Sequence, residues 1–289
     1  MKIAVFYPPG MAAWSVARGL SVVFARMGHE ITDIGERRSP SKEELEKHDV
    51  LFVGGPEYRW QAIRSQVPQW DEIKKPKIGW MHEPVEREDY YYRTDFAPGG
   101  KLPVEQLKKL TPNLFSPAAQ DVAHGIPFMP LGVDTGMFKP TEGNKLYSVL
   151  FVGYMYPKRT HFLSTYPEVA KIISHEKPVF PEEYASVIGR SKMMLNLPSM
   201  SALQNARVYE TMACKTALVT PDFGVGPENY KLFEDGKHLM YFKGDPMPMV
   251  DRLLKGDYLR ESIAENGYQE VIAKHKLEHR LQKMLELSL

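Results

Sequence analysis

One short segment in the second half of the chain places an asparagine, an arginine and a glutamate at helical spacing. The residues are Asn205, Arg207 and Glu210, and a small polar loop after Pro198 precedes them. Free N–H groups at a helix start, here Asn205-Ala206, form a natural phosphate site. Asn205 could cap this helix, and Arg207 could pair with a diphosphate. Glu210 lies one turn later on the same face, where its carboxylate could accept hydrogen bonds from two ribose hydroxyls.

The same spacing also fits an ordinary ion pair between Arg207 and Glu210 on a solvated helix surface. The two interpretations differ in what surrounds the pair. A ligand site needs a rigid frame that brings further polar groups to the start of this helix.

The pattern of the chain predicts such a frame, because short apolar runs alternate with amphipathic stretches. Runs typical of strands buried on both faces occur at 2–7, 50–53, 77–81, 148–153, 193–197 and 216–220, with shorter ones at 114–115, 128–129 and 239–242. Helical spacing occurs at 16–27, 182–190 and 206–214, and one long or two consecutive helices are predicted from about 257 to 287. This alternation indicates parallel sheets covered on both faces.

The length of 289 residues suggests two domains. The segment 132–140 (GVDTGMFKP) interrupts the alternation, so the boundary is expected near 138–146, giving domains 1–140 and 141–289. In open parallel sheets, ligands lie beyond the carboxyl ends of the strands. The loops after residues 7, 54, 81, 153, 197 and 220 are therefore the places to look for a site.

Composition narrows the classes of function. The chain has 43% hydrophobic and 25% charged residues and a formal net charge of +1, which argues against broad electrostatic binding of nucleic acid. Its single cysteine, Cys214, excludes an intramolecular disulfide and a cysteine-rich metal site. No apolar stretch is long enough for a membrane span and the apolar start is too short for a signal peptide, so a cytoplasmic protein is expected.

The pattern Asn-x-Arg-x-x-Glu-x-x-Ala from Asn205, followed by a strand and by 233–238 (FEDGKH), resembles the C-terminal domain of group-1-like glycosyltransferases. Within them it is most similar to the spore-coat maturation glycosyltransferases. Other segments resemble the family in the same order, namely 132–134 with 138–140, 150–153, 156–159, 181–184, 266–267 and His275. Together they cover most of residues 132–285.

The resemblance implies the GT-B fold, in which two Rossmann-like domains face each other across a cleft and the C-terminal helix can return to the N-terminal domain. It implies transfer of a sugar from a nucleoside-diphosphate sugar, with UDP-glucose favoured by family frequency, to a hydroxyl acceptor. Glu210 would hold the ribose. The diphosphate would meet Arg207, Arg159 and Lys158, the helix start at Asn205-Ala206, and the loop that opens at Gly153. Fixed cations of this kind can replace a metal ion, and no metal site or other cofactor is expected.

Two positions depart from the family pattern. Many retaining members carry a second acid eight residues before the helix glutamate, where this chain has Ala202, so the stereochemistry of transfer does not follow from the sequence. A glycine is also common after the Ala-Cys of this helix, where this chain has Lys215. That change concerns the turn from helix to strand more than the site.

The N-terminal domain should bind the acceptor and supply any general base. His82 and Glu83 follow the run 77–81, so either could take a proton from an acceptor hydroxyl, or either could merely cap the turn. Gly10 opens the first loop, where backbone could approach the donor sugar or simply make the turn of a β-α unit. The acceptor could be a glycan, a small metabolite, a protein or a hydroxymethylated base in DNA.

Two other functions fit the same donor-side residues. A non-catalytic nucleotide-binding module would keep Arg207 and Glu210 and lack a working base. A nucleotide-sugar epimerase can share the two-domain fold and would convert its substrate with no acceptor present. Release of a nucleoside diphosphate only when an acceptor is added would distinguish a transferase from both.

Overall fold

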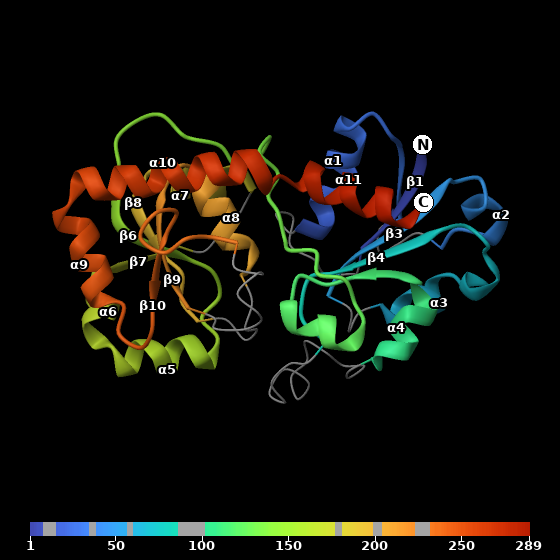
Figure 1. Ribbon diagram of the computed structural model, residues 1–289, viewed down its shortest axis with the longest axis horizontal. Helices are drawn as coiled ribbons and strands as arrows, with labels where there is room; N and C mark the ends of the chain where they lie inside the picture. The colour runs from blue at the N-terminus through green and yellow to red at the C-terminus, as the bar shows by residue number, and fades with distance from the viewer. Residues whose placement is uncertain are drawn as a thin grey trace. The chain divides into compact units, whose positions relative to one another are not determined.

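A computed structural model describes residues 1–7, 16–34, 39–56, 60–85, 102–176, 181–198, 204–222 and 232–289. The chain forms two compact units, the first from residues 1–131 with 277–289 and the second from residues 132–276. Each unit has one five-stranded parallel sheet with helices packed against it (Figure 1). This confirms the α/β class with two Rossmann-like units.

The first unit contains a sheet in the order β2-β1-β3-β4-β5. Its elements are β1 (Lys2–Phe6), α1 (Val16–Arg26), β2 (Glu30–Ile34), α2 (Lys42–Leu45), β3 (Val50–Gly55), α3 (Gln61–Gln66), the 3-10 helix η2 (Trp70–Glu72), β4 (Lys77–Met81), α4 (Val104–Leu110), β5 (Asn113–Phe115), the 3-10 helix η4 (Ala119–His124) and α11 (Leu277–Ser288). The central strands β3 and β4 are buried along their whole length, as their apolar runs predict. The apolar pair at 128–129 forms only an isolated bridge from Phe128 to Ser116, because Pro127 and Pro130 on either side have no N–H to donate to a ladder.

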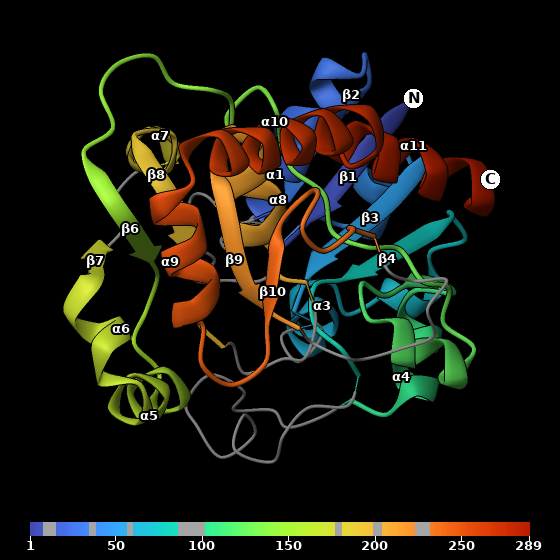
Figure 2. The same ribbon diagram turned by 60° about the vertical axis from the view of Figure 1, so that its left-hand side comes forward.

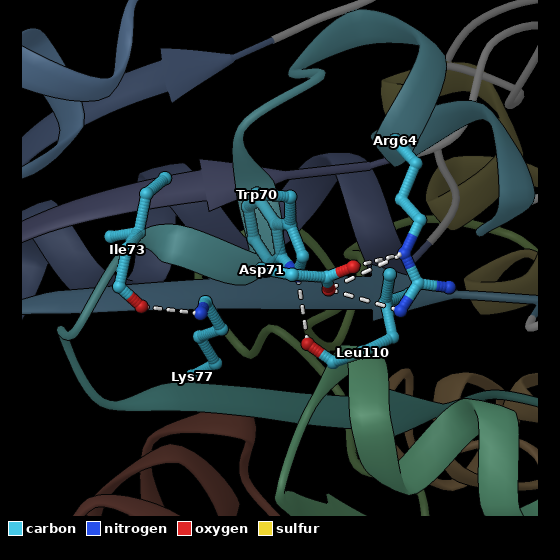
Figure 3. A network of polar contacts seen from close by, with 6 residues as sticks. All are labelled: Arg64, Trp70, Asp71, Ile73, Lys77 and Leu110. Atoms are coloured by element: carbon cyan, nitrogen blue, oxygen red, sulfur yellow. Dashed lines mark hydrogen bonds and ion pairs between the residues drawn. The ribbon is translucent and has the colours of Figure 1, made fainter.

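A tryptophan anchors the loop that leads into β4 (Figure 3). Trp70 is fully buried and its indole N–H donates to the carbonyl of Leu110, 2.8 Å away. Beside it, Arg64 makes two parallel hydrogen bonds to Asp71, and the ammonium of Lys77 donates to the carbonyl of Ile73. These contacts lie at the amino end of β4, since Lys77 is its first residue, and so they fix the strand from the end opposite to His82.

The second unit contains a sheet in the order β10-β9-β8-β6-β7. Its elements are β6 (Tyr147–Val152), α5 (Pro157–Thr165), α6 (Pro167–Ile172), β7 (Ile173–Glu176), α7 (Pro181–Gly189), β8 (Ser191–Leu195), α8 (Ala206–Ala213), β9 (Ala217–Pro221), β10 (Met240–Phe242), α9 (Met247–Lys255) and α10 (Asp257–Lys274). When the strands of each unit are counted in chain order, the two sheets have the same order (Figure 2).

The C-terminal stretch forms two helices that belong to different units. Helix α10 packs against α8 and β9, whereas α11 packs against α1 of the first unit and its Glu278 pairs with Arg26 at 2.6 Å. Between the helices, the carbonyl of His275 accepts from Val133 N–H. A side chain at Gly132 would lie 2.8 Å from that carbonyl oxygen, so only glycine allows the chain to pass this closely.

Candidate functional site

The strand order of the second sheet creates a natural ligand position. The chain leaves β6 toward β7 on one side and toward β8 on the other, and in open parallel sheets ligands bind beyond the carboxyl ends at such a reversal. The residues at these two strand ends are Gly153, directly after β6, and Asn196, directly after β8. Three of the predicted donor-binding residues, Gly153, Arg159 and Arg207, lie together here.

An aromatic ring at the end of β6 supports the two arginines. The guanidinium carbons of Arg159 and Arg207 lie 5.0 Å and 5.2 Å from the ring centre of Phe151, within the range of cation–π attraction. The imidazole of His175, at the end of β7, stacks on the same ring at 5.4 Å. The fully buried Phe151 therefore links the ends of two strands to both cations.

The glycine after this strand lets the two cations approach the backbone. Gly153 has a φ of +146°, a conformation that other residues rarely adopt. A Cβ there would lie 2.6 Å from Nη2 of Arg207 and 3.3 Å from Nη1 of Arg159. The carbonyl of Gly153 is held by Nε2 of His175 at 2.7 Å. A larger residue would displace at least one guanidinium.

Arg159 is almost fully buried, with 4% of its surface exposed. Its Nε donates to the carbonyl of Pro198 at 3.1 Å and its Nη1 to the carbonyl of Tyr154. Burial, with the nearby charge of Arg207, lowers the pKa of Arg159 to about 9. The depression means that the site holds positive charge at a cost, which an anion would offset.

Arg207 is oriented by a buried polar network. Its Nη1 donates to Oδ1 of Asn196 at 2.9 Å, and Nδ2 of Asn196 donates to the hydroxyl of Thr220 at 3.0 Å. The Nε of Arg207 is buried with no hydrogen-bond partner among the described residues. Within the same residues, no ion pair joins Arg207 to Glu210, so the interpretation as a solvated intrahelical pair is wrong.

Helix α8 begins beside this cluster, directly after Asn205. Asn205 occupies the N-cap position, but its side chain makes no capping hydrogen bond. Its Oδ1 instead accepts from Asn196 at 3.5 Å. The expectation that Asn205 caps the helix with its side chain is therefore wrong, and no side-chain cap bond occupies the N–H groups that begin at Ala206.

Glu210 is buried in the second turn of α8, with 5% of its surface exposed. Its Oε2 accepts a hydrogen bond of 2.7 Å from the hydroxyl of Tyr184 on α7. Burial raises the pKa of Glu210 to about 7, against the opposing effects of this bond and of the Arg207 charge. With so little exposure, this carboxylate is not a surface charge.

The predicted residues of the first unit lie at the carboxyl end of β4. His82 N–H donates to the carbonyl of Gly55 at 3.2 Å, and its ring meets the edge of Trp80 at 5.1 Å. Part of His82 is exposed, but its Nε2 is buried and has no hydrogen-bond partner among the described residues. Burial lowers the pKa of His82 to about 3, so the imidazole is neutral at physiological pH. Glu83 is half-buried beside it.

A buried acid fixes the chain just after these two residues. Both carboxylate oxygens of Asp121 accept from Val85 N–H, at 3.1 and 3.2 Å, and one also accepts from the hydroxyl of Ser116. Asp121 is fully buried. It therefore ties the segment that follows His82 to η4.

Three further positions from the sequence analysis are not among the residues that form the cluster as described. Lys158 is exposed on α5. Gly10 and Ala202 lie outside the described residues. Among the described residues, no three side chains of His, Cys, Asp or Glu gather as metal ligands would, and no helix is long and apolar enough to cross a membrane.

Sequence reasoning missed four residues that shape this site, namely Phe151, His175, Tyr184 and Asn196. Asn196 carried a signal, because it is a polar residue inside the apolar run 193–197. Tyr184 and Phe151 stood in recognised segments without a role. His175 carried no signal in the sequence, because its contacts are with residues at the end of the neighbouring strand, β6.

The sequence profile of a family described as glycosyl transferase-like matches residues 137–286, just over half of the chain. Among curated proteins, none matches the sequence.

Solved structures resemble the whole chain. HepE from Anabaena, crystallised with UDP-glucose, has a TM-score of 0.65 at 10% identity and covers 99% of both chains. Sucrose-phosphate synthase from Thermosynechococcus elongatus gives 0.64 at 13% identity over 99% of this chain and 98% of its own. A glycosyltransferase from Rickettsia africae gives 0.62 at 12% identity over 99% and 97%. At these identities the likeness shows the fold. With the profile match, it follows that the chain belongs to the glycosyl transferase-like family and is a glycosyltransferase of the GT-B fold.

Proposed function

We propose that this glycosyltransferase takes a glucosyl group from UDP-glucose and transfers it to a hydroxyl acceptor without a metal ion. The observation that carries the proposal is the pair of arginines, Arg159 and Arg207, that flank the backbone of Gly153. Neither pairs with a carboxylate among the described residues. The choice of donor is supported by HepE, whose structures were solved with UDP-glucose and with UDP.

The arginines suit a leaving group that gains charge. As the bond between the sugar carbon and the phosphate oxygen breaks, that oxygen keeps the bonding electrons. Cations and N–H dipoles already aimed at the diphosphate stabilise the developing charge, and removal of one such donor typically costs about 100- to 1,000-fold in rate. Arg159, Arg207 and the start of α8 would share this role, with the exposed Lys158 reaching the outer phosphate.

Glu210 would accept hydrogen bonds from the ribose hydroxyls of the donor. Its burial supports this role, because a buried carboxylate makes strong charge-assisted hydrogen bonds. Tyr184 occupies Oε2, which leaves Oε1 and the second lone pair of Oε2 for the ligand.

The acceptor hydroxyl would be bound by the first unit near His82 and Glu83. Neutral His82 has a free nitrogen lone pair, but a pKa of about 3 makes it a weak base at neutral pH. We therefore propose that His82 orients the acceptor or sugar by hydrogen bonding, and that Glu83 is the better candidate for the base. The acceptor classes remain a glycan, a small metabolite, a protein or a hydroxymethylated DNA base.

We also propose a cytoplasmic location and membership of the spore-coat maturation subgroup. The single cysteine is buried and unpaired, which suits the reducing cytoplasm. Membership of the spore-coat maturation subgroup rests on the segment pattern around Asn205 alone.

Calorimetric titration with UDP-glucose, in buffer containing EDTA, tests the donor and the metal together. We expect binding that EDTA does not abolish and, in a separate assay with a hydroxyl acceptor, release of UDP that EDTA does not abolish. GDP-mannose and UDP-N-acetylglucosamine serve as comparison donors. If another donor binds more tightly, that donor takes the place of UDP-glucose in the proposal. If EDTA stops UDP release and magnesium restores it, the metal-free mechanism is contradicted.

A further inference from the structure

Two buried residues from adjacent helices share a hydrogen bond that includes the proposed ribose-binding residue Glu210. Tyr184 on α7 and Glu210 on α8 are 4% and 5% exposed, and the phenol donates to Oε2 at 2.7 Å. The ring of Phe138 packs at right angles against that of Tyr184 with centres 5.6 Å apart. The phenol is thus held in place by its own neighbours.

Burial and the neighbouring groups shift the pKa of Glu210 in opposite directions. Burial raises the pKa of Glu210 to about 7, while the bond from Tyr184 and the charge of Arg207 lower it. Burial raises the pKa of Tyr184 far above its usual value, so its hydroxyl stays protonated and remains a donor. Cys214 also lies near this acid, and its pKa is raised by burial and then by the Glu210 charge, so it stays a neutral thiol.

We propose that Tyr184 is a positioning residue, whose hydroxyl holds the Glu210 carboxylate in the orientation and charge state that bind the donor ribose. The inference rests on the proposed role of Glu210. A neutral carboxyl would present a hydrogen where the ribose hydroxyls need an acceptor. Tyr184 supplies a donor that favours the ionised form without adding a charge to the site.

This arrangement links donor binding to pH. When only the ionised form of Glu210 binds the ribose, affinity falls as the pH drops through the pKa of Glu210 and levels off above it. Loss of the Tyr184 hydroxyl raises that pKa and moves the fall to higher pH. A residue that only fills space would change affinity equally at every pH.

Carboxyl NMR of the ligand-free protein measures the coupling directly. With isotopically labelled glutamate, the Glu210 signal is identified by its loss in Glu210→Gln. We expect a titration midpoint near 7 in the wild type. In Tyr184→Phe we expect it to be higher by about 1, because the lost hydrogen bond stabilised the ionised form. An unchanged midpoint overturns the inference.

Calorimetry with UDP-glucose then tests the effect on binding. A midpoint higher by about 1 leaves about one-eighth as much ionised Glu210 at about pH 6.5, so Tyr184→Phe should weaken affinity about eightfold there and less than about twofold near pH 8.5. In a Glu210→Gln background, Tyr184→Phe should have no further effect. Equal losses at both pH values, or the same loss in both backgrounds, would show a packing role only.

Tyr166→Phe is the matched control, because it removes the same hydroxyl from a half-buried ring in the same unit, packed on Phe162. It should leave both the midpoint and the affinity unchanged. The two proposals fail separately. If UDP-glucose binds the wild type and Glu210→Gln equally, the ribose role of Glu210 is wrong and the ligand-binding part of this inference falls with it. The NMR titration still decides whether Tyr184 controls Glu210.

Discussion

The two units have the same strand order but carry opposite chemistry at the carboxyl ends of their strands. In the second unit, these ends meet two guanidinium groups and the buried Glu210. In the first unit, β4 ends at a neutral imidazole, His82, and the half-buried Glu83. One scaffold therefore presents different side chains at equivalent strand ends, so the chemistry comes from these residues and not from the fold.

Burial moves the two principal titratable groups in opposite directions. Burial of the ring lowers the pKa of His82 to about 3, with no charged partner among the described residues, whereas the pKa of Glu210 rises to about 7. Both shifts favour the neutral form, as desolvation always does. Only Glu210 has groups that restore its charge, namely Tyr184 and Arg207, and that difference suits a unit that binds a polar nucleotide.

Removing a cation from the charged edge should have the largest effect on ligand binding. We expect Arg207→Ala to weaken UDP binding by roughly 30- to 100-fold, because a buried charge-assisted contact to phosphate contributes about 2–3 kcal/mol. Arg207→Lys should lose less, since it keeps the charge but not the planar fork that Asn196 orients. Calorimetry measures both, with circular dichroism to confirm folding. Equal affinity in wild type and Arg207→Ala would remove the anion site.

The next largest effect is expected from the acid of the same edge. Glu210→Ala should weaken UDP and UDP-glucose binding by about tenfold, because two ribose hydroxyls lose a charged acceptor. The substitution also leaves the buried hydroxyl of Tyr184 without its Glu210 partner. Adding Tyr184→Phe should therefore restore stability while leaving binding weak. Unfolding by urea measures the first, and calorimetry the second. Normal affinity in Glu210→Ala would end the ribose assignment.

The first unit should respond to acid in the opposite sense to the second. The pKa of His82 is depressed when folded, so its contribution to stability is present above about pH 6.5 and is lost as the pH falls toward 3, at up to about 1.4 kcal/mol per pH step. Glu210 has a raised pKa, so its contribution grows as the pH falls from about 7 to about 4.5.

Hydrogen exchange separates the two units. In the wild type, acid should lower the protection of β3 and β4 against hydrogen exchange, and His82→Gln should make this loss smaller. Acid should raise the protection of α7 and α8, and Glu210→Gln should make that gain smaller. Transfer activity of His82→Gln should fall without a shift of its pH profile. A lost or shifted acid limb would instead identify His82 as the base.

The sequence predicted the parts of the fold that bury both faces. Central strands such as β3 and β4 carry continuous apolar runs, and their prediction was confirmed. The edge strands β2 and β7 were missed, because each has one partner and mostly exposed or half-exposed residues, so their apolar pattern is weak. Helices α10 and α11 were expected as one or two, and the structure has two, with the break at His275 and Lys276.

The site was predictable only where spacing along one helix carries the information. The pattern from Asn205 to Glu210 placed the start of α8, and the recognised loop after β6 led to Arg159. What the pattern could not supply was tertiary pairing. Whether Glu210 meets Arg207 or Tyr184 depends on how α7 packs on α8, and no spacing along α8 encodes it.

The smallest effect is expected on stability, at the turn from helix to strand, which the two units build with different residues. After α1 the turn uses Gly28 with φ +87°, whereas after α8 it uses Lys215 with φ +53°, a conformation that disfavours side chains. Lys215→Gly should raise the free energy of unfolding by about 0.5–1 kcal/mol, because it relieves that strain. It also removes an exposed ion pair with Glu265, and Lys215→Gln measures that loss separately. If urea unfolding finds that Lys215→Gly is no more stable than Lys215→Gln, the turn after α8 is unstrained, and a lysine there costs no more stability than Gly28 does in the turn after α1.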